Sequence, residues 1–266
     1  MSGLGPPGRP ALEQIDRLVE LFVQQWLGGL YILGSAGQGL LLSQEERKAV
    51  AVRAVKAAAG RLPVIVHVGA ITTDEAVQLA RHAGEIGADG IASVGPVYYP
   101  LQTDDIFEHY HRIGSAGGVP FFVYQIDVVN QPKMPREQYV SRVLEIPHIA
   151  GMKITGSDLY QFGLLHRYSQ GRLKLFSGKD QLLCHAILSG AAGAIGFFYN
   201  LWGPECRAAR EAFLRGQPVH ASLPTSHSRS TRRRRVAIPP SRHAASLRHR
   251  HRPFPRSLIK GGQAGR

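Results

Sequence analysis

Lys153 and Tyr124 are the two residues whose types and positions most strongly suggest chemistry. Lys153 ends the apolar run of residues 149–152, and a hydroxyl, Thr155, follows it closely. Partial removal of an amine from water lowers its pKa, so that neutral amine becomes available to attack a carbonyl. The Schiff base that forms is an electron sink, which allows a neighbouring C–C bond to be made or broken. Tyr124 ends an earlier apolar run and is a candidate proton carrier.

Plainer interpretations of these residues remain open from the residue pattern alone. Lys153 could extend to solvent or pair with Asp180. The turn at residues 34–37, with the sequence Gly-Ser-Ala-Gly, offers backbone N–H groups and a hydroxyl that could hold a carboxylate. The same turn is compatible with a tight connection between a strand and a helix.

The elements that must position these groups follow a repeated pattern. Apolar runs typical of strands begin near residues 29, 62, 89, 119, 148, 172 and 191, and helical patterns separate them. Alternation of this kind predicts a parallel sheet with right-handed crossovers. Seven strands are one short of an eight-stranded (β/α) barrel, in which functional groups lie at the carboxyl ends of the strands. Both Lys153 and Tyr124 are at such ends.

The predicted fold is therefore α/β, of the TIM (β/α)8 barrel type, without the first strand and the C-terminal helices. The barrel domain is predicted to span residues 11–218, after a disordered N-terminus at 1–10. Residues 219–266 contain 12 Lys and Arg residues and no acidic residue, which leaves +1 of the net charge of +13 for the rest. This segment is rich in Arg, Ser, His and Pro and is predicted to be a disordered basic tail.

Composition also narrows the class of protein. Two cysteines are too few for a disulfide framework, and no secretory signal or membrane-spanning run is visible. We therefore expect a soluble, cytoplasmic chain without a membrane partner. The basic tail could act as a nucleic-acid arm, but no recognition fold and a single aromatic residue accompany its charge, which favours a tail without this function.

Several segments, in this order, resemble the dihydrodipicolinate synthase and N-acetylneuraminate lyase superfamily. They are "GLYILGSAGQG", "HVGAITTDEAVQLARHAGEIGADGIASVGPVYYP", "FFVYQI", "GMKITGSDLYQ", "SGKDQLL" and "GAAGAIGFFYN". The resemblance covers about residues 11–216, and the details around "VYYP" and "KITGSDLYQ" are most similar to the N-acetylneuraminate lyase branch.

The resemblance implies a pyruvate-dependent class I lyase, usually a homotetramer, that needs no metal or organic cofactor. It implies that Lys153 captures pyruvate as a Schiff base and that Tyr124 relays protons. The other residues that it implicates bind substrate: Ser35 and Ala36 at the pyruvate carboxylate, Thr155 beside the lysine, Gly178, Asp180 and Gln181 at the sugar hydroxyls, Phe197 near the far end of the sugar, and Tyr98 in the neighbouring subunit's site.

Four positions depart from the family's usual pattern. Ala36 stands where a threonine is usual, Gln38 and Gln181 replace glutamates, and Phe197 replaces a serine. The change at Ala36 removes one hydroxyl from the carboxylate site but keeps its backbone N–H, so the pyruvate half is largely spared. The aldehyde half is altered, so another acceptor aldehyde is an alternative. A dihydrodipicolinate synthase-like enzyme is a second alternative, although "YQIDVVNQP" supplies no arginine for its second carboxylate. The third alternative is a catalytically impaired, truncated isoform with a binding or regulatory role.

Overall fold

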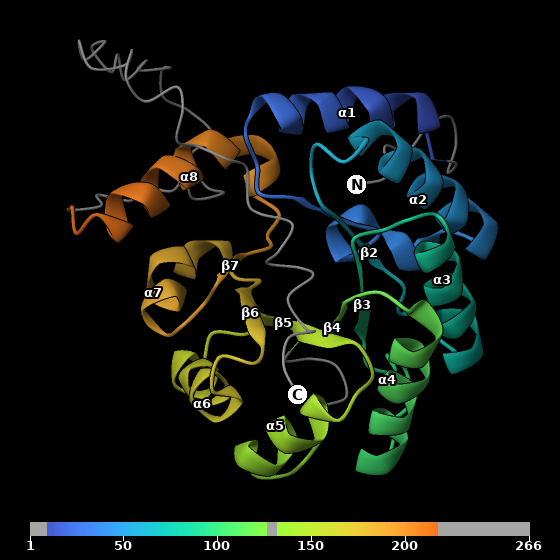
Figure 1. The fold of residues 1–266 in the computed structure, drawn as a ribbon, viewed down its shortest axis with the longest axis vertical. Helices are drawn as coiled ribbons and strands as arrows, with labels where there is room; N and C mark the ends of the chain where they lie inside the picture. The colour runs from blue at the N-terminus through green and yellow to red at the C-terminus, as the bar shows by residue number, and fades with distance from the viewer. Residues whose placement is uncertain (1–9, 127–131, 218–266) are drawn as a thin grey trace, which may run out of the picture.

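Seven parallel strands form one curved sheet, and helices cover its outer face (Figure 1). The computed structural model describes residues 10–126 and 132–217. Neighbouring strands pair in the order of the sequence, so each helical connection returns the chain to the next position in the sheet. The strands are β1 (Leu30–Ile32), β2 (Val64–His67), β3 (Gly90–Val94), β4 (Phe121–Ile126), β5 (Ile149–Thr155), β6 (Lys174–Ser177) and β7 (Gly193–Ala194).

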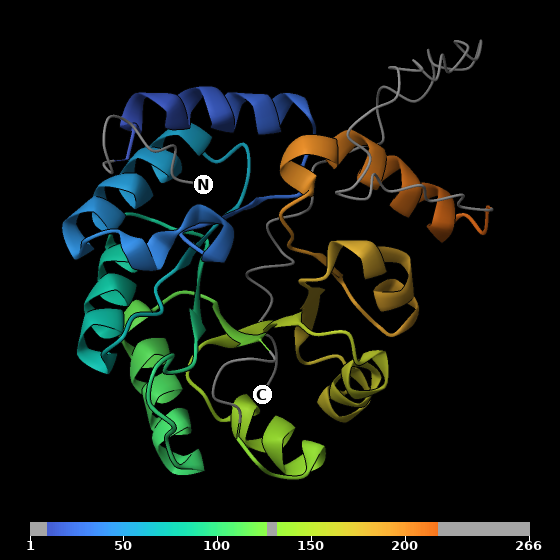
Figure 2. The same ribbon diagram turned by 180° about the vertical axis from the view of Figure 1, so that it is seen from behind.

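The helices form a ring outside the sheet when it is seen from either side (Figure 2). Three short 3-10 helices lie in the loops that follow β1 and β6: η2 (Ser35–Gly37), η3 (Gly39–Leu41) and η4 (Asp180–Leu182). The α-helices are α1 (Leu12–Gln24), α2 (Gln44–Ala58), α3 (Thr73–Glu85), α4 (Thr103–Gly117), α5 (Arg136–Leu144), α6 (Leu159–Ser169), α7 (Leu183–Leu188) and α8 (Tyr199–Leu214).

Side-chain caps fix the starts of three helices. The Ser43 hydroxyl accepts a hydrogen bond from the Glu46 N–H at 3.2 Å, and the Glu46 carboxylate accepts one from the Ser43 N–H at 2.9 Å. The spacing of a serine and a glutamate three residues apart predicts this capping box at α2 from the sequence. Thr72 and Glu75 have the same spacing at α3, but only half of the box is present: Thr72 accepts from the Glu75 N–H, while the Glu75 carboxylate lies 3.9 Å from Arg47. Asp158 caps α6.

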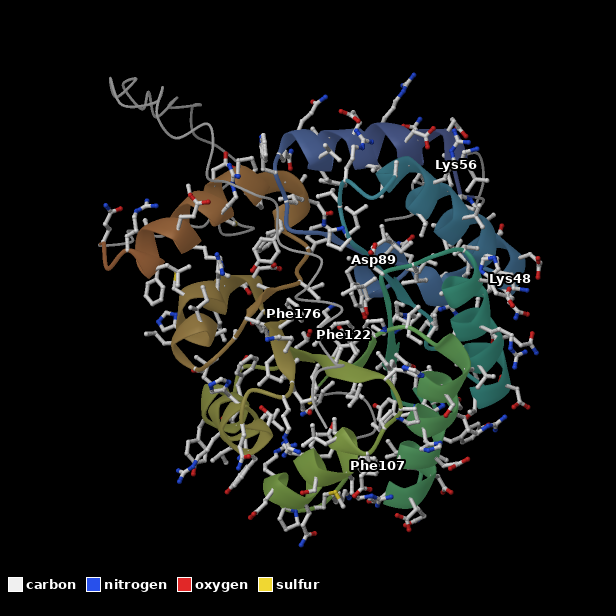
Figure 3. All side chains as sticks on the ribbon, in the orientation of Figure 1. Lys48, Lys56, Asp89, Phe107, Phe122 and Phe176 are labelled. Carbon is white, nitrogen blue, oxygen red and sulfur yellow. The ribbon has the colours of Figure 1, made fainter. Side chains whose placement is uncertain are left out.

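Each strand of the sheet has one face toward the helices and one toward the interior. Val64, Val66 and Ile91 are among the strand residues that pack with the helices in the main core. A smaller inner cluster consists of Ile65, Ala92 and Phe122, with Tyr31, Ala150 and Phe176 packed against it. Phe122 of β4 and Phe176 of β6 lie toward each other across this interior, with ring centroids 5.8 Å apart (Figure 3). The interior is thus filled with side chains, as in a closed barrel.

A bulge in β5 sets the direction of Lys153. The pairing register of β4 with β5 shifts between Phe121, which pairs with Ile149, and Phe122, which pairs with Gly151. One extra residue in β5 allows Ile149 and Met152, three positions apart, both to pack against the helix-facing core. Side chains alternate after the bulge, so Lys153 faces the interior between two outward-facing apolar residues.

Gly151 at this bulge has no room for a side chain. A Cβ atom placed there would lie 2.1 Å from the carbonyl oxygen of Lys174. We therefore expect Gly151→Ala to lower the free energy of unfolding by about 2 kcal/mol or more, because β5 and β6 would have to separate. Urea denaturation measures the loss. Gly163→Ala in α6 is the matched control: no atom lies within 4 Å of its added Cβ, so stability should stay equal or rise by up to about 1 kcal/mol. Equal stability of the Gly151 variant would contradict the expected clash.

The sheet is open between its first and last strands. In the described residues β1 pairs only with β2, and β7 only with β6, which agrees with the predicted seven-stranded barrel-like fold. The helices nevertheless meet across this opening, because Gly203 of α8 lies close to Leu27, which follows α1; Figures 1 and 2 show α8 beside that end of α1. None of the described helices is long and apolar enough to cross a membrane.

The last strand and helix differ from the sequence prediction. The apolar run that begins near residue 191 continues to residue 199 and predicts a strand of that length, but β7 ends at Ala194 and α8 already begins at Tyr199. The chain turns at Gly196, where an added Cβ would lie 1.5 Å from the Asp180 carboxylate. The predicted disordered segments 1–10 and 219–266 lie outside the described residues except for Pro10, so those assignments remain predictions.

Candidate active site

The amine of Lys153 is enclosed at the carboxyl end of β5. Its side chain is 8% exposed, and its Nζ lies 4.3 Å from the ring centroid of Tyr31 and 4.2 Å from that of Tyr124. Burial lowers the pKa of Lys153 to about 8, and the Asp180 carboxylate opposes part of that decrease. About a tenth of the amine is then uncharged at neutral pH. The side chain neither extends to solvent nor takes part in an ion pair within the described ranges.

Three rings surround this amine in a triangle. The centroids of Tyr31, His67 and Tyr124 are 6.1 to 6.2 Å apart from one another. Burial, together with the nearby Arg47 and Lys153 charges, lowers the pKa of His67 to about 3, so its imidazole is neutral. The imidazole Nε2 accepts a hydrogen bond from the Val94 N–H at 3.3 Å. His67 is therefore a packed, hydrogen-bonded histidine.

The hydroxyl of Thr155 joins the two predicted catalytic residues. Thr155 donates a hydrogen bond to the phenol oxygen of Tyr124 at 3.4 Å. Lys153 and Tyr124 are also register partners in β5 and β4, which places both side chains on the interior face of the sheet. Gly178 lies so close that a Cβ atom there would be 1.9 Å from the Thr155 hydroxyl. The structure therefore brings Lys153, Tyr124, Thr155 and Gly178 together.

Ser35 and Ala36 lie in η2, directly after β1. The backbone enters this turn through Leu33 in the left-handed region, with φ 61°, and leaves it through Gln38, with φ 54°. Inside the turn the Gly37 N–H bonds to the Gly34 carbonyl and the Gln38 N–H to the Ser35 carbonyl. Ser35 and Ala36 are exposed at the start of the turn, at the same end of the sheet as Lys153. That this turn holds a carboxylate stays a prediction.

Asp180 is tied to the loop between β7 and α8. Its Oδ2 accepts a hydrogen bond from the Phe197 N–H at 3.2 Å, and burial raises the pKa of its carboxyl group. Gln181 is exposed, and the Phe197 ring is 52% exposed on the same loop. These three residues therefore form one side of the rim, above β6 and β7.

Tyr98 lies apart from the buried cluster. It is 77% exposed on the loop after β3, and its ring contacts the ring of Tyr99 with centroids 4.8 Å apart. Such exposure is compatible with a role outside its own chain, but the single chain does not place Tyr98 beside Lys153. Within the described ranges no cluster of three or more His, Cys, Asp or Glu side chains could hold a metal ion.

Comparison with known proteins identifies the family. Residues 5–229 match the model of the dihydrodipicolinate synthetase family, which is most of the chain. Over 210 residues, the chain is 34% identical to an N-acetylneuraminate lyase of Enterobacter sp. (strain 638). The match covers 79% of this chain and 70% of that protein. The chain belongs to the dihydrodipicolinate synthetase family.

Solved structures support the same assignment. A sialic acid aldolase of Ruminococcus gnavus superposes with a TM-score of 0.77 at 27% identity, covering 81% of this chain and 71% of that chain. A dihydrodipicolinate synthase of Aquifex aeolicus superposes with a TM-score of 0.76 at 26% identity, covering 81% and 73%. The fold is therefore that of a pyruvate-dependent class I aldolase family whose members include both activities.

Two residues beside the site were not among the predicted site residues. Tyr31 alternates with the outward-facing Leu30 and Ile32, a pattern that could have placed it inside the sheet. Arg47 of α2 is 1% exposed and donates hydrogen bonds to the carbonyls of His67 and Gly69, both at 2.9 Å. Arg47 shares the 3–4-residue spacing of the buried Val50, Ala51 and Ala54, and this spacing is the feature of the sequence that could have predicted its burial.

Proposed function

We propose that this family member is a Schiff-base lyase that cleaves N-acetylneuraminate to N-acetylmannosamine and pyruvate, reversibly. The observation that carries this proposal is the enclosed amine of Lys153, with a lowered pKa, beside the phenol of Tyr124. The names of the curated relatives at 34–36% identity favour this substrate over others in the family. The chain covers 63–70% of the length of those relatives.

The chemistry begins with the neutral form of the Lys153 amine. It adds to the keto carbonyl, the carbonyl oxygen leaves as water, and one proton is taken up, so the nitrogen ends as an iminium. The iminium withdraws electrons from the neighbouring bond, which breaks to release the aldehyde and leave an enamine. Tyr124, held by Thr155, relays the proton: its phenol oxygen takes the proton of the substrate hydroxyl as the phenol's own proton passes to the enamine carbon, so the tyrosine ends unchanged. Hydrolysis of the iminium then releases pyruvate without a metal or an organic cofactor.

The remaining predicted residues take binding roles in this proposal. The turn at Ser35 and Ala36 holds the pyruvate carboxylate through its backbone and one hydroxyl. Gly178, Asp180 and Gln181 face the sugar hydroxyls, and Phe197 lies toward the far end of the sugar. We also infer a homotetramer, in which the exposed Tyr98 reaches the neighbouring subunit's site.

Borohydride trapping with pyruvate tests the first step. The full chain is incubated with pyruvate and borohydride, and peptides are analysed by mass spectrometry. We expect a reduced pyruvyl adduct on Lys153 and none on Lys179, which follows the neighbouring strand and is only half-buried. A folded chain without an adduct on Lys153 would overturn the proposal and favour a non-catalytic, truncated isoform.

Product analysis separates the lyase from its alternatives. With N-acetylneuraminate as substrate, release of N-acetylmannosamine and pyruvate is the expected result. Trapping of pyruvate without this cleavage would assign the chain to another pyruvate aldolase, and condensation with aspartate semialdehyde would assign it to the dihydrodipicolinate synthase-like group. The neutral Gln181 and the exposed Phe197 ring are the residues that would admit a different aldehyde.

A further inference from the structure

Tyr31 is the partly buried side chain beside Lys153 that the proposed mechanism leaves without a role. Its phenol oxygen is enclosed and has no hydrogen-bond partner within the described residues. Burial, and to a lesser extent Tyr124, raises the pKa of Tyr31 well above its ordinary value, so the phenol stays protonated. A phenol without a hydrogen-bonded neighbour is poorly placed to relay protons. The feature of Tyr31 that does contact the reacting amine is the face of its ring.

Within the described residues, the charges around the Lys153 amine leave it without a close anion. Of the groups that face it, His67 of β2 is neutral, Tyr31 is an uncharged phenol, Tyr124 presents its ring, and Arg47 lies behind the His67 carbonyl. The Asp180 carboxylate acts on the amine from η4 without forming an ion pair with it. A cation at Nζ therefore depends largely on the two rings that lie 4.2 and 4.3 Å away.

We propose that the ring face of Tyr31, 4.3 Å from Nζ, is an electrostatic partner of the reacting nitrogen and stabilises its two cationic forms, the ammonium and the iminium. The part of this inference that concerns the iminium rests on the proposed Schiff-base function. The part that concerns the ammonium does not. Both forms carry their positive charge on the same nitrogen. The negative face of an aromatic ring attracts such a charge, and more strongly where water is excluded.

The contact has a distinctive pH signature. Below the pKa of Lys153 the free enzyme holds an ammonium, so the ring stabilises reactant and iminium alike and its effect on pyruvate binding cancels. Above that pKa the free amine is neutral and only the iminium gains. If removal of the ring lowers the proton affinity of the amine by about tenfold, iminium formation should become about tenfold weaker at pH 9. At pH 6 it should become weaker by less than about twofold.

Three variants of the full chain test this contact. Tyr31→Leu removes the ring, and Tyr31→Phe keeps it and removes only the hydroxyl. Phe122→Leu removes a ring of the same inner cluster that contacts no cation among the described residues. The first measurement needs no pyruvate: the rate of Lys153 acetylation by limiting acetic anhydride, followed from pH 6 to pH 11 by peptide mass spectrometry, gives the pKa of the amine. The second is the pyruvate dependence of borohydride trapping at pH 6 and pH 9.

We expect Tyr31→Leu to lower the pKa of Lys153 by about one pH unit and to weaken trapping at pH 9 only. Tyr31→Phe should match the native chain in both measurements, and Phe122→Leu should lose stability with the pKa of Lys153 unchanged. An unchanged pKa in Tyr31→Leu would overturn the inference, and so would a Tyr31→Phe variant that behaves like Tyr31→Leu. If pyruvate traps on none of the variants nor on the native chain, the proposed function fails, while the acetylation measurement still decides whether the ring stabilises the ammonium.

Discussion

Replacing Lys153 with methionine is expected to abolish pyruvate trapping and, at the same time, to stabilise the fold. Methionine has a similar length and no charge, so it fills the space between the Tyr31 and Tyr124 rings without the cost of a buried cation. Burial lowers the pKa of Lys153 from 10.5 to about 8, a difference that corresponds to about 3 kcal/mol at pH 7. We expect the free energy of unfolding to rise by about 2 to 3 kcal/mol, as measured by urea denaturation.

The pH dependence of that gain has a defined sign. Because the folded pKa lies below the unfolded value, the unfolded chain binds more protons between pH 8 and pH 10.5, and the native protein becomes more stable as pH rises through this window. The advantage of Lys153→Met should therefore be complete below pH 8 and shrink toward pH 10.5. Lys179→Met is the control that should keep the adduct and change stability little. A methionine variant less stable than the native chain at pH 7 would show that the ammonium is not strained by burial.

A Lys153→Met variant that gains stability and loses trapping would show that the burial of this amine costs folding free energy and serves the reaction instead. Burial of an amine is unfavourable to folding, but the same burial supplies neutral nucleophile at neutral pH. The Tyr31 and Tyr124 rings reduce the free-energy cost of the buried ammonium, but they do not neutralise its charge as a close carboxylate would. An ion pair at Nζ would hold the amine in its protonated form and remove the nucleophile. The arrangement of rings therefore favours a nitrogen that is alternately neutral and cationic.

The sequence predicts the architecture and the direction of Lys153, but not the surroundings of its amine. The alternation of Met152, Lys153 and Ile154 places the lysine inside, and the strand order places Tyr124 beside it. The bulge at residues 149–151 depends on pairing with β4, which no local pattern in β5 reveals. Tyr31 is distant in sequence, and its contact with Nζ follows from the curvature that brings β1 toward β5 across the interior.

The aldehyde side of the rim shows a second limit of sequence reasoning. The run "AAGAIGFFY" is apolar enough for a strand, yet the chain leaves the sheet after Ala194. The reason is tertiary: the Phe197 N–H turns toward the Asp180 carboxylate, which lies on the preceding loop. The backbone engages Oδ2 of that carboxylate, while Oδ1 is buried and has no hydrogen-bond partner within the described residues. The position of Asp180 on the rim thus depends on a contact that a local pattern cannot show.

The second prediction with a large effect concerns Arg47, whose guanidinium is buried behind the site. One of its nitrogens donates to the carbonyls of both His67 and Gly69, at the carboxyl end of β2. Burial lowers the pKa of Arg47 to about 10, so it remains charged at neutral pH. Arg47→Met is expected to lower the free energy of unfolding by about 3 kcal/mol, because two enclosed carbonyls lose their donor.

Arg47→Met should also weaken pyruvate trapping, since the end of β2 carries the His67 ring that lies against Tyr31 and Tyr124. Arg53→Met on the same helix is the matched control. Arg53 pairs with Asp16 at the surface, where its side chain is 43% exposed, and its loss should cost less than about 1 kcal/mol and leave trapping intact. Urea denaturation and borohydride trapping of both variants make the comparison. Equal stability of the two variants would mean that the carbonyls at the end of β2 find water or other donors, and that the ring triangle around Lys153 holds its shape without Arg47.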